Sequence, residues 1–223
     1  NDGSGRAGAG VHCFLGAPEI VRCTISLNHH GTDGGGVSAT ACSDFRMTSC
    51  TIAGNFAFIS GGGVFSGNLH ARFTDCLFSG NTCEERGGGL LAEPNAPSGG
   101  LEVVGCVFEQ NASLFYQGGA LCLGISGATA ATSVRDCVFH RNHGAFGGAI
   151  YGSGTIDACR FVENTADRDG GAVWSTGALL RNCSLLRNQV AAAASPDVAG
   201  TARVLHATMT GGGVGTNPRP GGY

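Results

Sequence analysis

The sequence contains no lysine: its 13 basic residues are all arginine, and 16 acidic residues leave a net charge of −3. A nucleic-acid-binding protein normally carries a basic surplus, so that class is excluded. No run of 18 apolar residues occurs, and no basic segment followed by an apolar one opens the chain. We therefore expect no membrane span in this segment and no secretion signal within it. Charged residues make up only 13% of the chain, which argues against a charged disordered polymer or a coiled coil.

The 11 cysteines include no Cys-x-x-Cys pair, the commonest zinc-site spacing, and we expect no metal. Seven of them instead begin a motif, Cys-x-apolar-x-x-Asn, that returns every 22 to 31 residues. A period in this range is the signature of a solenoid. The motif cysteines and asparagines are Cys23, Cys50, Cys76, Cys106, Cys137, Cys159 and Cys183, and Asn28, Asn55, Asn81, Asn111, Asn142, Asn164 and Asn188.

A second motif, two glycines followed by a small residue and an aliphatic one, comes five to seven residues after each of the first six asparagines. Apolar residues also stand three positions before and two positions after each motif cysteine. A step of two keeps side chains on one strand face, whereas a step of three implies a bend. Helices are excluded, because each glycine would cost about 1 kcal/mol. The sequence predicts an all-β fold, a right-handed parallel β-helix of about eight coils spaced about 4.8 Å apart.

We expect residues 1–213 to form a single β-helix and residues 214–223 to form a C-terminal tail. Asn1 stands seven residues before Gly8, the same interval as between Asn111 and Gly118, so the chain is expected to begin inside a repeat of a longer region. Solenoids need polar caps at both ends. No cap is recognisable in the sequence, and we expect flanking coils or a partner to cover the N-terminal end.

The sequences FSGN, FEQN, FHRN and FVEN, which alternate with GGAL, GGAI and GGAV, resemble the F-x-x-N and G-G-A-[ILV] repeats of the chlamydial polymorphic outer membrane proteins. The resemblance runs from Asn1 to about Gly213. It implies a right-handed parallel β-helix and export from the cytoplasm. It also implies a role in adhesion or in the structure of the cell surface.

The repeated cysteines and asparagines are expected to form structural ladders. Free cysteine is among the most buried residue types, which favours a row of small apolar side chains over a metal or redox array. Asparagines at a turn satisfy backbone groups and one another. Asn111 and Asn182 both have the form of glycosylation sequons, and Asn182, outside the ladder, is the candidate for modification.

The residue after each aliphatic residue of the glycine motif should point outward, since side chains alternate along a strand. This places large apolar groups in one external stripe, which is typical of a protein interface, although aromatic faces also stack on sugars. The alternative is burial beneath the longer loops 92–102 and 123–133. The predicted contact face consists of Phe65, Leu91, Tyr151 and Trp174.

Catalytic β-helices that act on acidic polysaccharides need clustered carboxylates, usually for calcium, and a basic residue. Asp167, Arg168 and Asp169, with Arg160 and Glu163 nearby, are the candidates for such a site. The corresponding turn of other repeats carries varied residues such as Glu84-Glu85-Arg86, so a solvated turn is favoured. Calcium belongs only to this alternative, and we expect no cofactor.

The sequence therefore predicts a non-catalytic β-helix outside the cell or at its surface. It would act as a structural or adhesive scaffold, in a larger chain or assembly. Its partners would be proteins or further copies of itself, or a polysaccharide. The alternative is a carbohydrate-active β-helix, a lyase or epimerase, or a glycan-binding module.

Overall fold

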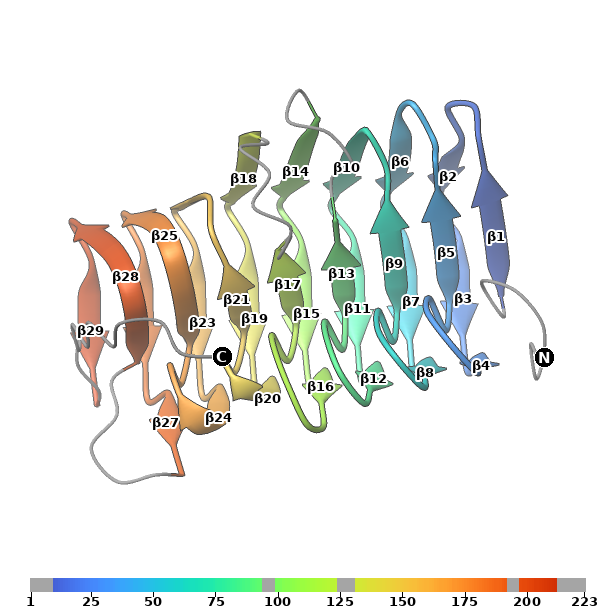
Figure 1. Ribbon diagram of the computed structural model, residues 1–223. Coiled ribbons are helices and arrows are strands. Elements are labelled where there is room, and N and C mark those ends of the chain that lie inside the picture. The colour runs from blue at the N-terminus through green and yellow to red at the C-terminus, as the bar shows by residue number, and fades with distance from the viewer. Residues whose placement is uncertain (1–9, 94–98, 124–130, 192–196, 212–223) are drawn as a thin grey trace.

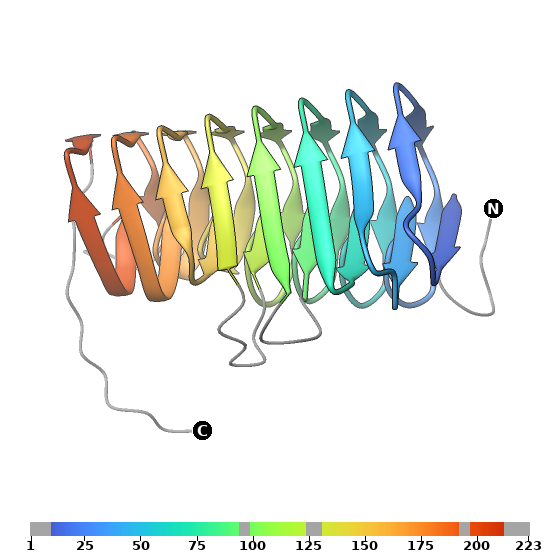
Figure 2. The same ribbon diagram turned by 90° about the horizontal axis from the view of Figure 1, so that it is seen from above.

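The computed structural model describes residues 10–93, 99–123, 131–191 and 197–211. Within these residues every helix or strand element is a β-strand, and the strands pair in parallel in three sheets. Figures 1 and 2 show the coils stacked side by side into a rod, with the first and last coils at opposite ends. The predicted all-β parallel β-helix is confirmed. Asn1 and the expected tail, residues 214–223, lie outside the described residues.

Sheet A contains 14 strands in the described part of the chain. It has two halves, which are joined at β25, and most coils contribute one strand to each half. The strands that follow the glycine motif are β1 (Val11–Phe14), β5 (Val37–Thr40), β9 (Val64–Gly67), β13 (Leu90–Ala92), β17 (Leu121–Leu123) and β21 (Ile150–Gly152). The strands before the motif cysteine are β2 (Glu19–Val21), β6 (Phe45–Thr48), β10 (His70–Thr74), β14 (Gly100–Val104), β18 (Ala131–Arg135) and β22 (Thr155–Asp157). In the last two coils the two strands merge into β25 (Val173–Arg181) and β28 (Val198–Leu205).

Sheets B and C complete each coil, before and after the asparagine. Sheet B consists of eight strands and therefore spans about seven turns: β3 (Thr24–Ser26), β7 (Thr51–Ala53), β11 (Leu77–Ser79), β15 (Val107–Glu109), β19 (Val138–His140), β23 (Arg160–Val162), β26 (Ser184–Leu186) and β29 (Thr208–Thr210). Sheet C consists of seven short strands: β4 (His29–His30), β8 (Phe56–Ala57), β12 (Thr82–Cys83), β16 (Ala112–Ser113), β20 (His143–Phe146), β24 (Thr165–Asp169) and β27 (Gln189–Val190).

The coil turns at residues in the left-handed backbone region. One stands immediately before each motif cysteine and one immediately before each motif asparagine, for example Asp136 (φ 55°) and Arg141 (φ 54°). Residues other than glycine rarely adopt this conformation. The bend that the three-residue step predicts therefore lies at the residue before the cysteine.

The glycine motif meets two separate requirements. Gly118 has a φ of 65°, which glycine adopts without strain. Gly119 lies so close to the next coil that a Cβ there would stand 2.2 Å from the His143 carbonyl oxygen and 2.3 Å from that of Gly148. The first position therefore requires a positive φ, and the second has no room for a Cβ atom. These two requirements explain why both positions recur as glycine in successive coils.

The interior of the rod is a single apolar cluster built from in-register rows. The aliphatic residues that follow the glycine motif form one row, the motif cysteines a second, and the residues two positions later a third. In the third row Phe78, Phe108, Phe139 and Phe161 stack face to face, with ring centroids 4.5, 5.0 and 4.9 Å apart. Each of these rings is fully buried.

The motif asparagines form a continuous hydrogen-bonded ladder. The Oδ1 atom of Asn111 accepts hydrogen bonds from the backbone N–H of Asn81 at 3.1 Å and from its Nδ2 at 2.9 Å. In turn, the N–H and Nδ2 of Asn111 both donate to Oδ1 of Asn142 at 3.0 Å. Nδ2 of Asn111 also donates to the carbonyl of Phe78, so each asparagine ties together three coils. The same pattern joins Asn28, Asn55, Asn81, Asn111, Asn142, Asn164 and Asn188.

The ladder ends beside a buried carboxyl group, that of Asp197, whose Oδ2 atom has no hydrogen-bond partner among the described residues. Burial raises the pKa of Asp197 from 3.8 to about 6, and a hydrogen bond with the Asn188 side chain opposes the rise. Folding therefore favours the protonated carboxyl. The stability that the protonated Asp197 carboxyl gives the folded state is complete below the unfolded pKa and is lost as the pH rises through the folded pKa.

We expect Asp197→Asn to raise the free energy of unfolding at about pH 7.5 by roughly 2 to 3 kcal/mol, since one pKa unit corresponds to about 1.4 kcal/mol. At about pH 3.5 the substitution should change stability little, because the wild-type carboxyl is then mostly protonated in both states. Urea unfolding at the two pH values measures the difference. An equal effect at both would contradict the role given to this carboxyl.

Candidate functional site

The predicted contact face is only partly exposed. Phe65, Tyr151 and Trp174 are partly accessible to solvent, but Leu91 is 1% exposed, so its prediction as a contact residue is wrong. All four lie in one register on the outer side of sheet A, as alternation along the strand predicts. Cys122, which lies between Leu91 and Tyr151 in this row, is also buried.

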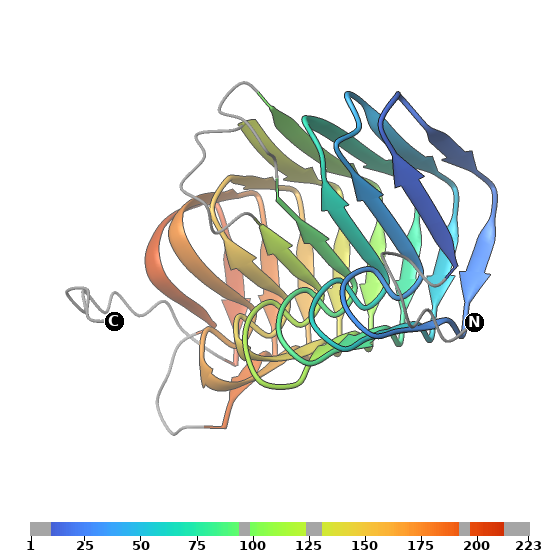
Figure 3. The same ribbon diagram turned by 45° about the vertical axis from the view of Figure 1, so that its right-hand side comes forward.

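A second, smaller apolar layer explains this burial. The loops that return from sheet C to sheet A stack on one another, and backbone bridges join Ser60, Arg86, Gln117 and Phe146 in successive coils. Figure 3 shows these loops as a stack beside the rod. The buried apolar residues outside the central cluster are Ala57, Cys83, Leu91, Cys122, Ala145, Ala166 and Ala199.

An aromatic cluster lies on the outer side of the coils near β21 and β25. The rings of Tyr151 and Trp174 stack with centroids 4.6 Å apart and an interplanar angle of 1°. Phe146 packs edge-on against Trp174 at 6.2 Å, and the guanidinium of Arg168 lies 5.4 Å above the Phe146 ring. The three rings are partly exposed and Arg168 is exposed. We call Phe146, Tyr151, Arg168 and Trp174 the aromatic cluster.

Exposed apolar residues in the neighbouring coil extend this surface. The Phe146 N–H donates to the carbonyl of Tyr116 at 3.0 Å, which brings the loop of Tyr116 beside the cluster. Leu114, Phe115 and Tyr116 in that loop are all exposed. Sequence analysis missed Phe146 and this loop. The signal that could have found them is the apolar Leu-Phe-Tyr run in a turn where the preceding repeat carries Glu84-Glu85-Arg86.

The carboxylates of the candidate catalytic turn have structural partners. Oδ2 of Asp167 lies 3.5 Å from Nε2 of His143, and Oδ1 of Asp169 accepts the N–H of Gly170 at 3.0 Å. Arg168 covers Phe146 instead of facing either aspartate. The structure thus joins two groups that sequence analysis treated separately, since Arg168 belongs to the aromatic cluster.

Glu163, the third carboxylate of that alternative, pairs with other residues. Its Oε2 lies 2.9 Å from Nε of Arg141, and its Oε1 lies 3.4 Å from Nη1 of Arg187. The hydrogen bond from Arg141 lowers the pKa of the Glu163 carboxyl below its usual value. Arg160 is exposed and forms part of β23 in sheet B.

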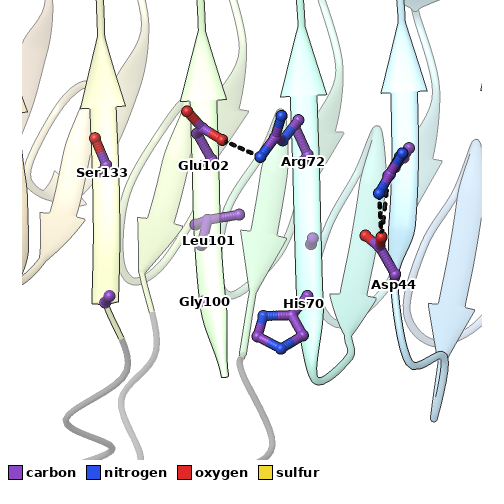
Figure 4. A pocket seen from close by; sticks show the side chains of 10 residues that line it. Asp44, His70, Arg72, Gly100, Leu101, Glu102 and Ser133 are labelled. Carbon is purple, nitrogen blue, oxygen red and sulfur yellow. Dashed lines mark hydrogen bonds and ion pairs between the residues drawn. The ribbon is translucent and has the colours of Figure 1, made fainter. Parts of the chain in front are cut away.

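A polar groove of about 340 Å³ opens on the outer side of the other half of sheet A (Figure 4). His70, Gly100 and Ala131 stand in register in β10, β14 and β18. The hollow forms because His70 is followed in the next two coils by residues with little or no side chain.

Ion pairs border the groove. Nη2 of Arg72 lies 2.7 Å from Oε2 of Glu102, and Arg135 pairs with the other oxygen of the same carboxylate. Arg46 forms a second pair with Asp44 at 2.5 Å. Sequence analysis missed this groove. Its signal is the row of polar residues four positions before successive motif cysteines: Glu19, Arg46, Arg72, Glu102 and Ser133.

The cysteine rows are free thiols in the structure. Every motif cysteine after Cys23 is buried, whereas Cys23, in the first coil, is exposed. Burial raises the pKa of Cys83 to about 12 and that of Cys183 to about 11. These two thiols are therefore protonated at neutral pH and poorly nucleophilic. No cluster of three or more metal-ligating side chains occurs within the described ranges.

The two sequon asparagines differ in accessibility. Asn111 is fully buried in the ladder, whereas Asn182 is exposed at a corner, where its Nδ2 donates to Oδ1 of Asp157 at 2.8 Å. Glycosylation at Asn182 stays a prediction.

The fold and its rows of stacked residues define a parallel β-helix repeat protein. The family model of the right-handed β-helix region matches residues 1–131, which is more than half of the chain. The chain therefore belongs to this family. Neither a comparison with curated proteins nor one with solved structures gave a match. Among the described residues no helix has the length and apolar character to cross a membrane.

Proposed function

We propose that the protein is a non-catalytic β-helix that acts as a structural or adhesive scaffold outside the cell or at its surface. The observation that carries this proposal is the aromatic cluster: stacked, partly exposed rings beside the exposed loop of Leu114, Phe115 and Tyr116. Aromatic side chains combine large contact area with little conformational freedom, and they are enriched at binding interfaces. The proposed function needs no cofactor.

The location outside the cell rests on the resemblance of the repeats to those of the polymorphic outer membrane proteins. A rod of stacked, mutually hydrogen-bonded coils also suits a spacer, because each coil is held by both of its neighbours. The partner of the aromatic cluster would be a protein surface, since few polar groups converge on the rings to orient a sugar.

The polar groove favours a second candidate function, binding of an acidic or neutral glycan. Arginine, histidine, serine and carboxylate groups at its border can bind hydroxyl and carboxylate groups. A catalytic role would further require a proton-accepting group positioned at the bound sugar.

The test is binding of the labelled protein to immobilised extracellular proteins and polysaccharides, measured by biolayer interferometry. We expect binding to a protein surface that falls about tenfold or more in Trp174→Ala, because one lost anchor of about 1.4 kcal/mol has that effect. Phe58→Ala, which removes another exposed ring outside the cluster, is the control and should bind normally. Thermal melting checks that both variants fold.

Binding that is unchanged in Trp174→Ala would contradict the proposal. Cleavage of an acidic polysaccharide that is lost in Asp169→Ala would favour the catalytic alternative. Glycan binding that is lost in Arg72→Ala but kept in Trp174→Ala would favour the groove.

A further inference from the structure

The exposed apolar loop, residues 114–116, lies against an acidic loop of the preceding coil that carries Glu84 and Glu85. The N–H of Phe115 donates to the carbonyl of Glu84 at 2.9 Å. The N–H of Gln117 donates to the carbonyl of Glu85 at the same distance. Figure 3 shows the loops of successive coils stacked beside the rod. Since Glu84 and Glu85 are partly exposed, two carboxylates border the apolar surface.

Basic side chains near this border are few. Arg86 is the only basic residue in residues 73–134, a stretch that contains six acidic residues. Arg86 itself pairs with Glu93 at 3.3 Å. Neither Glu84 nor Glu85 forms an ion pair with any other residue that the structure describes. The two carboxylates are therefore available to a cation from outside the chain.

The carboxyl group of Asp33, in the same stack of loops, lies within the electrostatic field of these glutamates. Burial raises the pKa of the Asp33 carboxyl, and the carboxylates of Glu93 and Glu85 raise it as well. The backbone N–H of Ser60 and the Arg86 guanidinium oppose the rise. The surroundings of the loops thus contain several carboxylates and one guanidinium.

Carboxylates also border the aromatic cluster on its other side. Asp167 is exposed and Asp169 is partly exposed, and the two flank Arg168 in the chain. Arg168 lies over the Phe146 ring. The partly exposed rings and the exposed apolar loop therefore have acidic residues on both sides. An apolar surface with a charged rim is the usual form of a protein-binding site, and the sign of the rim selects the partner.

We propose that the protein partner of the aromatic cluster is basic, and that its surface presents lysine or arginine side chains next to apolar ones. The partner covers the aromatic cluster and the exposed apolar loop, and its cations face Glu84 and Glu85. Opposite charges speed such an encounter and like charges disfavour the wrong partner. A cation above an aromatic ring adds a further attraction. This inference rests on the proposed function, because it names the chemistry of the surface that the aromatic cluster binds.

Three synthetic peptides of equal length test the proposal. In the first, lysine and phenylalanine alternate; the second has glutamate in place of lysine, and the third has serine in place of phenylalanine. Binding of the full-length protein to each immobilised peptide is measured by biolayer interferometry. We expect the lysine and phenylalanine peptide to bind about tenfold or more tighter than either of the others. Added salt should weaken this binding, because exposed charges are screened.

Variants locate the contact on the protein. Glu84→Gln/Glu85→Gln should weaken binding of the lysine and phenylalanine peptide about tenfold, because it removes both bordering charges. Glu19→Gln/Glu109→Gln, a matched loss of two charges elsewhere on the rod, should bind as the wild type does. Phe115→Ala should also weaken binding, because this exposed ring belongs to the contact. Thermal melting confirms that each variant is folded.

The outcomes separate this inference from the proposed function. Equal binding of the lysine and glutamate peptides, or wild-type binding by Glu84→Gln/Glu85→Gln, would overturn the inference. If binding to an extracellular protein is nevertheless lost in Trp174→Ala, the proposed function stands and only the charge assigned to the partner is wrong. If no peptide and no extracellular protein depends on Trp174, the proposed function fails and this inference fails with it.

Discussion

Phe108→Ala is expected to lower the free energy of unfolding by about 3 to 5 kcal/mol, the usual cost of removing a fully buried phenylalanine. The Phe108 ring stacks on Phe78 at 4.5 Å and on Phe139 at 5.0 Å. The cavity would therefore remove contacts from the coils on both sides. The stiff ladders around the cavity leave little room for collapse, which favours the upper part of that range.

Phe115→Ala is the matched control, because Phe115 belongs to the same coil and is 59% exposed. It should change stability by less than about 0.5 kcal/mol, as most surface substitutions do. Urea unfolding measures both, and hydrogen exchange should show faster opening in the coils next to Phe108. Similar losses in the two variants would contradict the stacked row as a main source of stability.

Asn111→Ala is expected to have a comparable effect for a different reason. The substitution removes the Oδ1 atom that accepts both hydrogen bonds from Asn81, and it removes the donor to the Phe78 carbonyl. Each buried polar group left without a partner costs about 1 to 3 kcal/mol. Because three groups are affected, we expect a loss of roughly 3 to 9 kcal/mol, or failure to fold.

Asn182→Ala serves as the control, since this exposed asparagine loses a single hydrogen bond, to Asp157. It should cost about 1 kcal/mol or less. If Asn111→Ala does not fold, Asn111→Ser, whose hydroxyl keeps a small polar group in the ladder, supplies a measurable intermediate. Equal stability of Asn111→Ala and Asn182→Ala would show that the ladder contributes little.

Much of the interior could be predicted because the same few residue types recur at fixed positions. The two-residue step from Cys137 to Phe139 gives a shared strand face, and the three-residue step from Val134 to Cys137 gives the bend that Asp136 makes. In a stack of repeats, each residue also packs against the equivalent residue of the next repeat, as Phe108 packs against Phe139. Register then follows from the pattern.

The exterior could be predicted only in part. Alternation correctly places Leu91 on the outer side of its strand, but it does not say what covers that side. The second apolar layer contains Ala57, Cys83, Ala145 and Ala166, which belong to the short strands of sheet C. Nothing in a two-residue period predicts how a loop folds back, because its position depends on backbone pairing with loops in other coils.

The polar groove and the aromatic cluster could not be predicted from the repeat pattern either. The hollow beside His70 exists because Gly100 and Ala131 stand in register with it, although they are 30 and 61 residues away in the chain. The contact of Arg168 with Phe146 depends on a shifted register between β20 and β24. Both features depend on local departures from the repeat.

The sequence by itself therefore determined the coil, its inward rows and the asparagine ladder, because buried side chains in a repeated unit must match the unit above and below them. The tertiary structure alone decided which outward residues reach solvent, where Arg168 lies, and where the polar groove opens. Those features depend on contacts between residues that follow no common period, and such contacts exist only once the chain has folded.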